Sequence, residues 1–242
     1  MAGTRLDAEL VGRGLVRSRS RAADLITRGR VTVNGRAITK PAYRTLPSDS
    51  VEVADDHYVS RAAHKLIGAL DHFDGLTVPA RVLDAGASTG GFTQVLLERG
   101  ATRVYAVDVG HDQLAEPIRT DPRVVVHEGT NLRDLTVSHV DDEPVQLVVA
   151  DVSFISLTLL LAPVLGVLAP DGRALLMVKP QFEVGRGNLD GHGVVRDPEL
   201  RTRAVDGVVS AAAELGWRCL GREPSPLPGP AGNQEFFVLL AR

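Results

Sequence analysis

Apolar residues at the start of the chain recur first with helical and then with strand periodicity. Helices are predicted at 6–14 and 20–29, because Leu, Val, Ala and Ile recur there every three or four residues and a glycine ends each run. The run 31–35 ends in Asn-Gly, which favours a tight hairpin because both turn positions need positive φ. A further strand at 50–53 completes a small α+β unit. The short polar stretch 49–58 is predicted to form a hinge.

After residue 59 the pattern changes to strands that alternate with amphipathic helices. Each strand is almost entirely apolar, as expected for a parallel sheet buried on both faces. The predicted strands are 81–86, 104–109, 124–127, 145–151, 174–178, 217–221 and 236–240. The predicted helices are 62–70, 92–99, an apolar helix after 154, and 198–216, with a long loop at 180–197. We therefore predict an α/β fold: a mostly parallel, seven-stranded Rossmann-like sheet in residues 59–242, preceded by a small α+β domain in residues 1–58.

The composition is that of a globular protein. Hydrophobic residues make up 44% of the chain and charged residues 24%. No apolar run reaches the roughly 18–20 residues that span a bilayer, and the first residues lack the apolar core of a signal peptide. The single cysteine, Cys219, excludes an internal disulfide and a cysteine metal cluster. We expect a cytoplasmic protein without a membrane partner.

The charge is unevenly distributed, although the net charge is only −3. Residues 1–46 hold ten basic and three acidic side chains, a balance of +7, so the remainder carries −10. This asymmetry indicates a module that meets a polyanion, with nucleic acid as the leading candidate. The alternative is a solvated, arginine-rich helical surface. Aromatic residues make up 4%, which disfavours stacking on single-stranded bases as the main binding mode.

Short motifs in this basic segment resemble the RNA-binding domain named after ribosomal protein S4. They are Arg5-Leu6-Asp7, Gly14-Leu15, Ser18-Arg19, Leu25-Ile26, Val33-Asn34-Gly35 and Lys40-Pro41. Domains of this kind bind structured RNA through phosphate contacts. The resemblance implies RNA contacts by six arginines, namely Arg5, Arg17, Arg19, Arg21, Arg28 and Arg30.

A glycine-rich segment lies between the first strand of the larger domain and the helix that follows it. Gly86 and Gly90 permit a tight turn and let a ligand approach bare backbone at a helix N-terminus. A dinucleotide pyrophosphate also suits such a place, but the spacing departs from G-x-G-x-x-G and lacks the lysine of a P-loop. The segment is similar instead to the methyltransferase loop that receives the methionine portion of S-adenosylmethionine.

Two further residues extend this candidate cofactor site. Asp108 ends the second strand and is expected to accept hydrogen bonds from the ribose hydroxyls of the cofactor. Asn131 follows the third strand and is expected near the adenine. The expected cofactor contacts are Gly86, Ala87, Ser88, Gly90, Gly91, Phe92, Asp108, Asn131 and Asp151.

Charged side chains end two neighbouring strands of the predicted sheet. Asp151 ends the fourth strand and Lys179 the fifth, so both lie at the carboxyl edge, where open α/β sheets bind ligands. Lys65 lies on the helix before the first strand, and Glu235 begins the last strand. An isolated lysine or glutamate is most often a surface charge, so the case for these two depends on the surrounding motifs.

Motifs spread over the whole chain resemble the TlyA (hemolysin A) family of ribosomal RNA 2′-O-methyltransferases. They are Ser60-Arg61, His64-Lys65-Leu66, residues 86–92, Asp151-Val152-Ser153-Phe154, Lys179-Pro180-Gln181-Phe182-Glu183 and residues 225–235. The resemblance implies the Lys-Asp-Lys-Glu tetrad of FtsJ-like enzymes, carried here by Lys65, Asp151, Lys179 and Glu235. Lys179 is then assigned to activating the ribose hydroxyl and Asp151 to orienting Lys179. Lys65 and Glu235 position the ribose and tune the charge, and no metal is required.

The same resemblance implies a partner and a target. Ribosomal RNA is the expected partner, with no obligate protein partner evident. The chain is shorter at both ends than longer members of the family, which favours a cytidine of the large-subunit RNA as the target. One alternative function is a membrane-lytic hemolysin, against which the lack of an aromatic-rich basic amphipathic helix argues. A second is a non-catalytic RNA-binding ribosome-assembly factor, and a third is methylation of protein or DNA.

Overall fold

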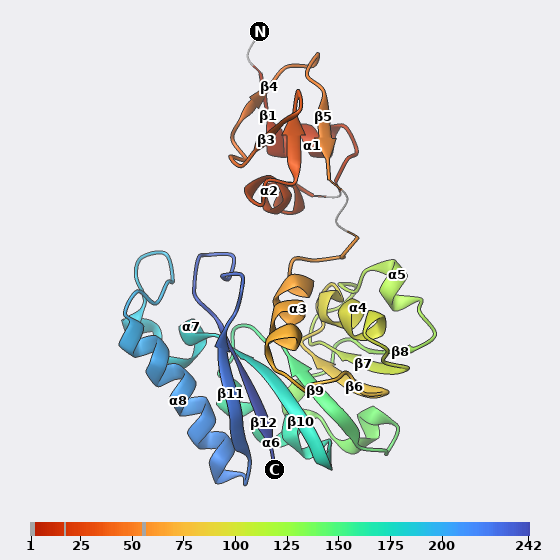
Figure 1. Cartoon of the computed structure of the whole chain (residues 1–242), viewed down its shortest axis with the longest axis vertical. Coiled ribbons are helices and arrows are strands. Elements are labelled where there is room, and N and C mark those ends of the chain that lie inside the picture. The colour runs from red at the N-terminus through yellow and green to blue at the C-terminus, as the bar shows by residue number, and fades with distance from the viewer. Residues whose placement is uncertain (1–2, 17, 55–56) are drawn as a thin grey trace. The chain divides into compact units, whose positions relative to one another are not determined.

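The computed structural model describes residues 3–16, 18–54 and 57–242. Contacts between residues divide the chain into two compact units, Met1–His57 and Tyr58–Arg242 (Figure 1). Each unit has its own hydrophobic core. Among the described residues, no helix combines the length and the apolar character needed to cross a bilayer.

The smaller unit packs two helices against a three-stranded antiparallel sheet. Its elements are β1 (Thr4–Arg5), α1 (Leu6–Gly12), α2 (Arg19–Thr27), β2 (Val31–Val33), β3 (Arg36–Ile38), β4 (Arg44–Thr45) and β5 (Val51–Val53). Strand β2 lies between β3 and β5. Asn34 and Gly35 form the predicted turn between β2 and β3, with φ of 51° and 76°. Leu6, Leu10 and Ile26 from the helices are fully buried, and the expected α+β unit is confirmed.

Local patterns missed the pairing of the first strand of this unit. β1 pairs antiparallel with β4, with Thr4 opposite Thr45. Two-residue strands are too short to show an alternation in hydrophobicity, so this pairing has no periodic signal. The start of α2 does follow its sequence signal, because the Ser18 hydroxyl accepts a hydrogen bond from the amide of Arg21 at 3.2 Å.

The larger unit is a seven-stranded sheet between helices (Figure 1). Its strands are β6 (Arg81–Ala85), β7 (Arg103–Val107), β8 (Val124–His127), β9 (Val145–Ala150), β10 (Leu168–Val178), β11 (Arg218–Pro224) and β12 (Phe236–Ala241). Its helices are α3 (Ala62–His72), α4 (Gly91–Glu98), α5 (Glu116–Arg119), α6 (Leu161–Gly166), α7 (Pro180–Glu183) and α8 (Pro198–Glu214). The strand order is β11-β12-β10-β9-β6-β7-β8. Strand β12 runs antiparallel to both of its neighbours, β10 and β11, whereas the other neighbouring strands of this sheet are parallel. The predicted mostly parallel sheet is therefore confirmed.

Side chains alternate between the two faces of this sheet, and each face has its own core. On β9, Leu147 and Val149 join the core that includes residues of α3 and α4. Val148 and Ala150 join the opposite core with residues of α6 and α8. Because successive residues of a strand point to opposite faces, a strand covered on both sides must be apolar at nearly every position. This explains the continuous apolar runs of the sequence.

Two segments differ from the sequence prediction. Strand β10 begins at Leu168 rather than near Ala174, and its pairing with β9 shifts register between Leu168 and Arg173. Polar residues at this irregularity interrupt the apolar pattern, so the start of the strand has no signal in the sequence. The predicted loop 180–197 begins with the single-turn helix α7, whose first residue is a proline with a backbone angle suited to a helix start.

Candidate active site

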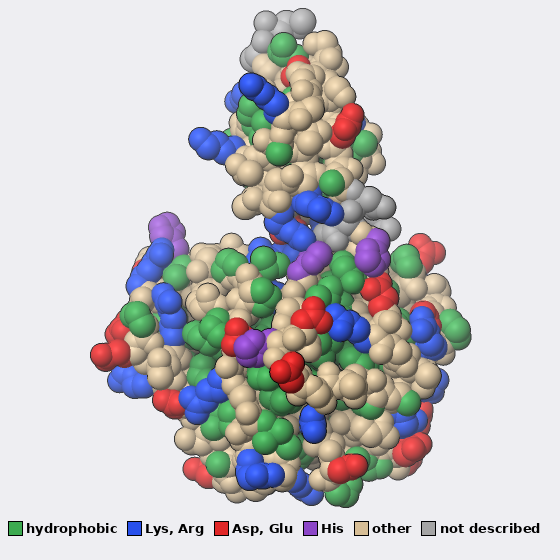
Figure 2. All heavy atoms as spheres, in the orientation of Figure 1, with side chains coloured by type: hydrophobic (Ala, Val, Ile, Leu, Met, Phe, Trp, Pro, Cys, Tyr) green, Lys and Arg blue, Asp and Glu red, His purple; other side chains and the backbone are tan. Residues whose placement is uncertain are grey.

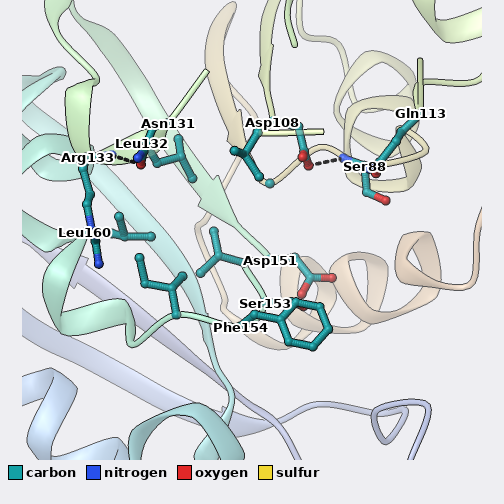
Figure 3. A pocket seen from close by; sticks show the side chains of 14 residues that line it. Ser88, Asp108, Gln113, Asn131, Leu132, Arg133, Asp151, Ser153, Phe154 and Leu160 are labelled. Atoms are coloured by element: carbon teal, nitrogen blue, oxygen red, sulfur yellow. Dashed lines mark hydrogen bonds between the residues drawn. The ribbon is translucent and has the colours of Figure 1, made fainter. Parts of the chain in front are cut away.

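Two adjacent cavities open at the carboxyl edge of the large sheet. The larger has a volume of about 570 Å³ and is lined by residues that follow β6, β7 and β9 (Figure 3). The smaller has a volume of about 240 Å³ and is lined in part by the start of α3. Both linings include Gly86, Ser88, Asp151 and Ser153. A group bound in one cavity can therefore meet a group bound in the other at these four residues.

The glycine loop between β6 and α4 forms a wall of both cavities. Gly86 and Gly90 have φ of 85° and 91°, a region that glycine adopts without strain. A Cβ on Gly86 would lie 2.8 Å from the carbonyl oxygen of Asp151. The amides of Gly86 and Ala87 donate to the carbonyl oxygen of Val107 at 2.8 and 3.2 Å. The loop is therefore held against the neighbouring strand and presents bare backbone to a ligand.

Asp108 lies directly after β7 and faces the glycine loop (Figure 3). One of its carboxylate oxygens accepts a hydrogen bond from the amide of Ser88 at 2.9 Å, and the other accepts one from Gly110 at 2.7 Å. A carboxylate oxygen can accept more than one hydrogen bond, so Asp108 can hold the loop and still bind a ligand hydroxyl. Across the cavity, the Asn131 side chain accepts a hydrogen bond from the amide of Arg133 at 3.0 Å.

Ala87, Gly91 and Phe92 line the smaller cavity. The ring of Phe92, however, is in the core. Its residue is 2% exposed, and the ring stacks on Phe237 with 6.3 Å between centroids. The Phe92 ring therefore packs in the core directly after the glycine loop and stabilises it.

All four residues of the expected tetrad line the smaller cavity. Nζ of Lys65 lies 2.5 Å from Oε2 of Glu235, and Nζ of Lys179 lies 2.6 Å from Oδ1 of Asp151. Lys65 is 4% exposed and Lys179 is 9% exposed. Burial of a charge is costly unless an opposite charge compensates for it. The site therefore holds one fully buried lysine–carboxylate pair, Lys65 with Glu235, and one partly buried pair, Lys179 with Asp151.

Lys179 has a second partner that the sequence analysis did not select. Its Nζ donates a hydrogen bond to Oγ of Ser153 at 2.8 Å. The contact with Asp151 is an ion pair, because the buried Oδ1 accepts no aligned hydrogen bond from the residues that the structure describes. The position of Ser153 two residues after Asp151 was the signal available in the sequence.

The direction of β12 places Glu235 in this site. Because β12 runs antiparallel to β10, the residue before its first position lies at the same sheet edge as the residue after the last position of β10. Those two residues are Glu235 and Lys179. A Cβ on Gly229 would lie 2.7 Å from a carboxylate oxygen of Glu235, so the loop before β12 packs closely over this side chain.

Comparison with known proteins decides the family. The profile of the FtsJ-like methyltransferases matches residues 58–242, and that of the S4 domain matches residues 4–51. The chain belongs to the FtsJ-like methyltransferase family. This membership confirms the expectation of an enzyme that takes its methyl group from S-adenosylmethionine.

Individual relatives confirm the resemblance to the TlyA (hemolysin A) family. A protein of Mycobacterium tuberculosis named 16S/23S rRNA (cytidine-2′-O)-methyltransferase TlyA is 52% identical, over 98% of this chain and 89% of its own length. Hemolysin A of Brachyspira hyodysenteriae is 40% identical, over 97% of this chain and 98% of its own. A solved structure described as a hemolysin of Streptococcus thermophilus has a TM-score of 0.77 and 36% identity, and covers 99% of this chain and 88% of its own.

The residues at the larger cavity fit S-adenosylmethionine. The bare backbone of the glycine loop suits the methionine portion, which carries its own charged groups. Asp108 offers carboxylate oxygens to a ribose, and Asn131 lies on the opposite wall (Figure 3). The volume of about 570 Å³ is in the range of small-molecule sites. Among the described residues, no group of three or more His, Cys, Asp or Glu is placed to hold a metal ion.

Sequence reasoning also missed a buried acid beneath the glycine loop. Asp84 on β6 is fully buried, and one of its oxygens accepts a hydrogen bond from Oγ1 of Thr93 at 2.6 Å. Burial, with a smaller contribution from the negative charge of Asp151, raises the pKa of Asp84 to about 7, although the hydrogen bond from Thr93 lowers it. The apolar residues on either side gave no reason to single out this position.

The arginines expected to bind RNA lie in the S4 unit, where several pair with acidic residues. Arg5 donates two hydrogen bonds to Asp7, at 3.0 and 2.9 Å, and Arg19 donates one at 3.2 Å. These bonds lower the pKa of Asp7 to about 2. The side chains of Arg5 and Arg19 remain 42% and 62% exposed, so they can still reach a phosphate. Arg21 and Arg28 both lie within 3.6 Å of Asp24.

The last two of the six arginines are placed differently. Arg30 is exposed, just after α2, and Arg17 lies outside the described residues. Figure 2 shows charged side chains of both signs on the visible faces of the S4 unit and of the methyltransferase unit.

Proposed function

We propose that this chain transfers a methyl group from S-adenosylmethionine to the 2′-hydroxyl of a cytidine in ribosomal RNA. The observation that carries the proposal is the junction of the two cavities at Asp151 and Ser153, beside the amine of Lys179. A methyl donor in the larger cavity and a ribose in the smaller one would meet there. The names of the relatives support ribosomal RNA and cytidine as the target.

The residues of the tetrad take separate roles in this reaction. S-adenosylmethionine supplies an electrophilic methyl group on its positively charged sulfur. Lys179 gives up one proton to solvent before the reaction, and its Nζ then accepts the 2′-hydroxyl proton. At the same time the 2′-oxygen bonds to the methyl carbon and the carbon–sulfur bond breaks. The ammonium that results is again paired with Asp151. The ion pair with Asp151 and the hydrogen bond to Ser153 fix the direction of this amine. Exclusion of water and alignment of the reacting oxygen with the methyl group supply most of the remaining rate enhancement.

Lys65 and Glu235 hold the ribose on the far side of the smaller cavity. Their ion pair is buried, with 2.5 Å between Nζ of Lys65 and Oε2 of Glu235. The Lys65 ammonium can donate to a ribose oxygen, while Glu235 compensates its charge. The site is thus pre-organised, because substrate binding does not need to reorient long side chains.

The S4 unit supplies RNA affinity in this proposal. Residues 1–58 bind phosphates of a structured ribosomal element through Arg5, Arg17, Arg19, Arg21, Arg28 and Arg30, and residues 59–242 carry out the chemistry. The enzyme acts in the cytoplasm, where its ribosomal substrate lies, and needs no obligate protein partner.

Methylation of purified ribosomal subunits tests the proposal. The purified chain is incubated with each subunit and methyl-labelled S-adenosylmethionine, and the RNA is mapped by mass spectrometry. The expected product is a 2′-O-methylcytidine, which the Lys179→Ala variant should form at least about 100-fold more slowly. A methyl group on a base, or label in protein alone, would contradict the proposal. Binding of RNA without any transfer would favour the assembly-factor alternative, and dye leakage from liposomes would favour a lytic role.

A further inference from the structure

The loop after β9 carries a residue in a strained conformation at the larger cavity. Phe154 has φ of 66°, a left-handed value that is rare for any residue with a bulky side chain. The residue is also 91% exposed, so burial of its ring in a core does not impose the conformation. Such a conformation persists only where surrounding contacts hold it. Those contacts come from residues 179–183.

The first contacts involve the beginning and the middle of the loop. Lys179 donates to Oγ of Ser153 at 2.8 Å. Three residues further along, the ring of Phe182 lies against that of Phe154, with 5.3 Å between centroids and 50° between the ring planes. The contact between the rings of Phe154 and Phe182 is weak because Phe154 is exposed. Neither this contact nor the Lys179 hydrogen bond fixes the end of the loop at Ser156 and Leu157.

Glu183, the last residue of α7, secures that end. Its carboxylate accepts a hydrogen bond from Oγ of Ser156 at 2.6 Å and another from the amide of Leu157 at 2.8 Å. Burial raises the pKa of Glu183 although both hydrogen bonds oppose the shift, so its placement here has an energetic cost. Glu183 is not among the residues that line either cavity. Its polar contacts on the described residues are with the loop alone.

We infer that Glu183 is a positioning residue for methyl transfer. By fixing Ser156 and Leu157, it holds the loop in the one arrangement in which Ser153 accepts the hydrogen bond of Lys179. The same arrangement completes the wall of the larger cavity, because Phe154 and Ile155 line it. Glu183 thus controls the direction of the reacting amine from outside the site. This inference rests on the proposed function.

Two variants of Glu183 and one control test it in the full-length chain. Glu183→Ala removes both acceptors. In Glu183→Gln the amide oxygen still accepts from Leu157 and the amide nitrogen donates to the Ser156 hydroxyl. Glu214→Ala is the matched control, because Glu214 is an exposed residue at the end of α8. The measurements are the melting temperature, single-turnover rates at saturating cofactor, and kcat and KM for ribosomal RNA.

We expect Glu183→Ala to lower kcat by about 10- to 100-fold, the range expected when a reacting group is misplaced by an ångström or less. The KM for RNA should not change, because Glu183 lies outside both cavities. Glu183→Gln should restore most of the rate, and Glu214→Ala should behave as wild type. Wild-type rates in Glu183→Ala would overturn the inference. The inference would also be overturned if Glu183→Ala and Glu183→Gln lost the same share of the rate and this loss equalled the fraction of each variant that is unfolded. A residue with a merely structural role gives that pattern.

Amide hydrogen exchange supplies a readout that does not depend on activity. Loss of the Glu183 acceptor should speed exchange at Leu157 in Glu183→Ala but not in Glu183→Gln. If the Leu157 amide of Glu183→Ala exchanged as slowly as in wild type, the inference about Glu183 would be overturned but the proposed function would not. A wild-type chain that methylates no ribosomal RNA would instead overturn the proposed function, and the two failures are distinguishable.

Discussion

Lys65 and Glu235 form a buried ion pair, although 170 positions separate them in the sequence. Their side chains are 5% and 1% exposed, so water screens neither charge effectively. The pair links α3 to the start of β12, two elements at opposite ends of the methyltransferase unit in sequence. It therefore serves both the stability of the fold and the electrostatics of the smaller cavity.

Breaking this pair should destabilise the protein more than replacing it. Glu235→Ala should lower the free energy of unfolding by about 3–5 kcal/mol, because it leaves a buried ammonium without a counter-charge. The double variant Lys65→Met with Glu235→Met should recover most of that loss and remain inactive. Urea unfolding followed by circular dichroism measures both effects. A Glu235→Ala variant as stable as wild type would show that the pair contributes no net stability.

Substitutions of Lys179 separate proton transfer from charge stabilisation. Lys179→Ala should lower the methyl-transfer rate by roughly 10²–10⁴-fold, as expected for a lost general base, with little change in cofactor or RNA binding. Lys179→Arg should rescue poorly, because a guanidinium keeps its proton near neutral pH. Single-turnover methylation across a pH series is the measurement. Near-normal activity in Lys179→Arg would exclude the base role, and near-normal activity in Lys179→Ala would exclude the tetrad assignment.

Loss of the Asp108 carboxylate should weaken cofactor binding and spare RNA binding. We expect Asp108→Ala to reduce the binding free energy of S-adenosylmethionine by roughly 1.5–3 kcal/mol, the value of hydrogen bonds to a charged group. Asp108→Asn, which keeps one acceptor oxygen for the glycine loop, should lose less. Isothermal calorimetry with the cofactor measures both. An unchanged dissociation constant in Asp108→Ala would place the ribose contact elsewhere.

The buried carboxyl of Asp84 predicts a pH dependence of stability. The pKa of Asp84 is about 7 in the folded chain, against 3.8 for the exposed group. Between these two pH values the folded state keeps a proton on Asp84 that the unfolded state has lost. The contribution of Asp84 to stability is therefore fully present below about pH 4 and is lost as the pH rises to about 7. The slope cannot exceed about 1.4 kcal/mol per pH unit for one proton.

Asp84→Asn removes this titration. The free energy of unfolding of the variant relative to wild type should rise between about pH 4 and 7 and then level off. Urea unfolding at several pH values measures the difference, and Asp74→Asn, on the exposed turn after α3, serves as a control. Parallel pH profiles of wild type and Asp84→Asn would contradict the raised pKa.

Removal of residues 1–57 tests the division of labour between the two units. The remaining chain should fold and bind S-adenosylmethionine but lose affinity for ribosomal RNA. RNA binding by the intact chain should weaken steeply with salt, because phosphate contacts release counterions. Filter binding at several salt concentrations measures the RNA affinity of the truncated and the intact chain and its dependence on salt. Equal methylation of ribosomal RNA by the truncated and the intact chain would contradict an RNA-binding role for the S4 unit.

Local periodicity was sufficient to predict most elements of this fold. The continuous apolar runs identified the buried strands, and Asn34-Gly35 identified the hairpin turn, because each depends only on neighbouring residues. The carboxyl-edge positions of Asp151 and Lys179 followed as well, since parallel strands end at one edge. Their roles as catalytic residues, like those of Lys65 and Glu235, stay predictions until the variants above are measured.

Only the tertiary structure decided which charges meet. The strand order inserts β12 between β10 and β11, and this insertion brings Glu235 to Lys65; other orders of the same strands would bury the same apolar faces. The burial of Asp84, the hydrogen bond from Lys179 to Ser153 and the hold of Glu183 on the loop after β9 likewise depend on residues distant in sequence. Hydrophobic patterning specifies which face of an element is buried, whereas polar pairing depends on which elements become neighbours.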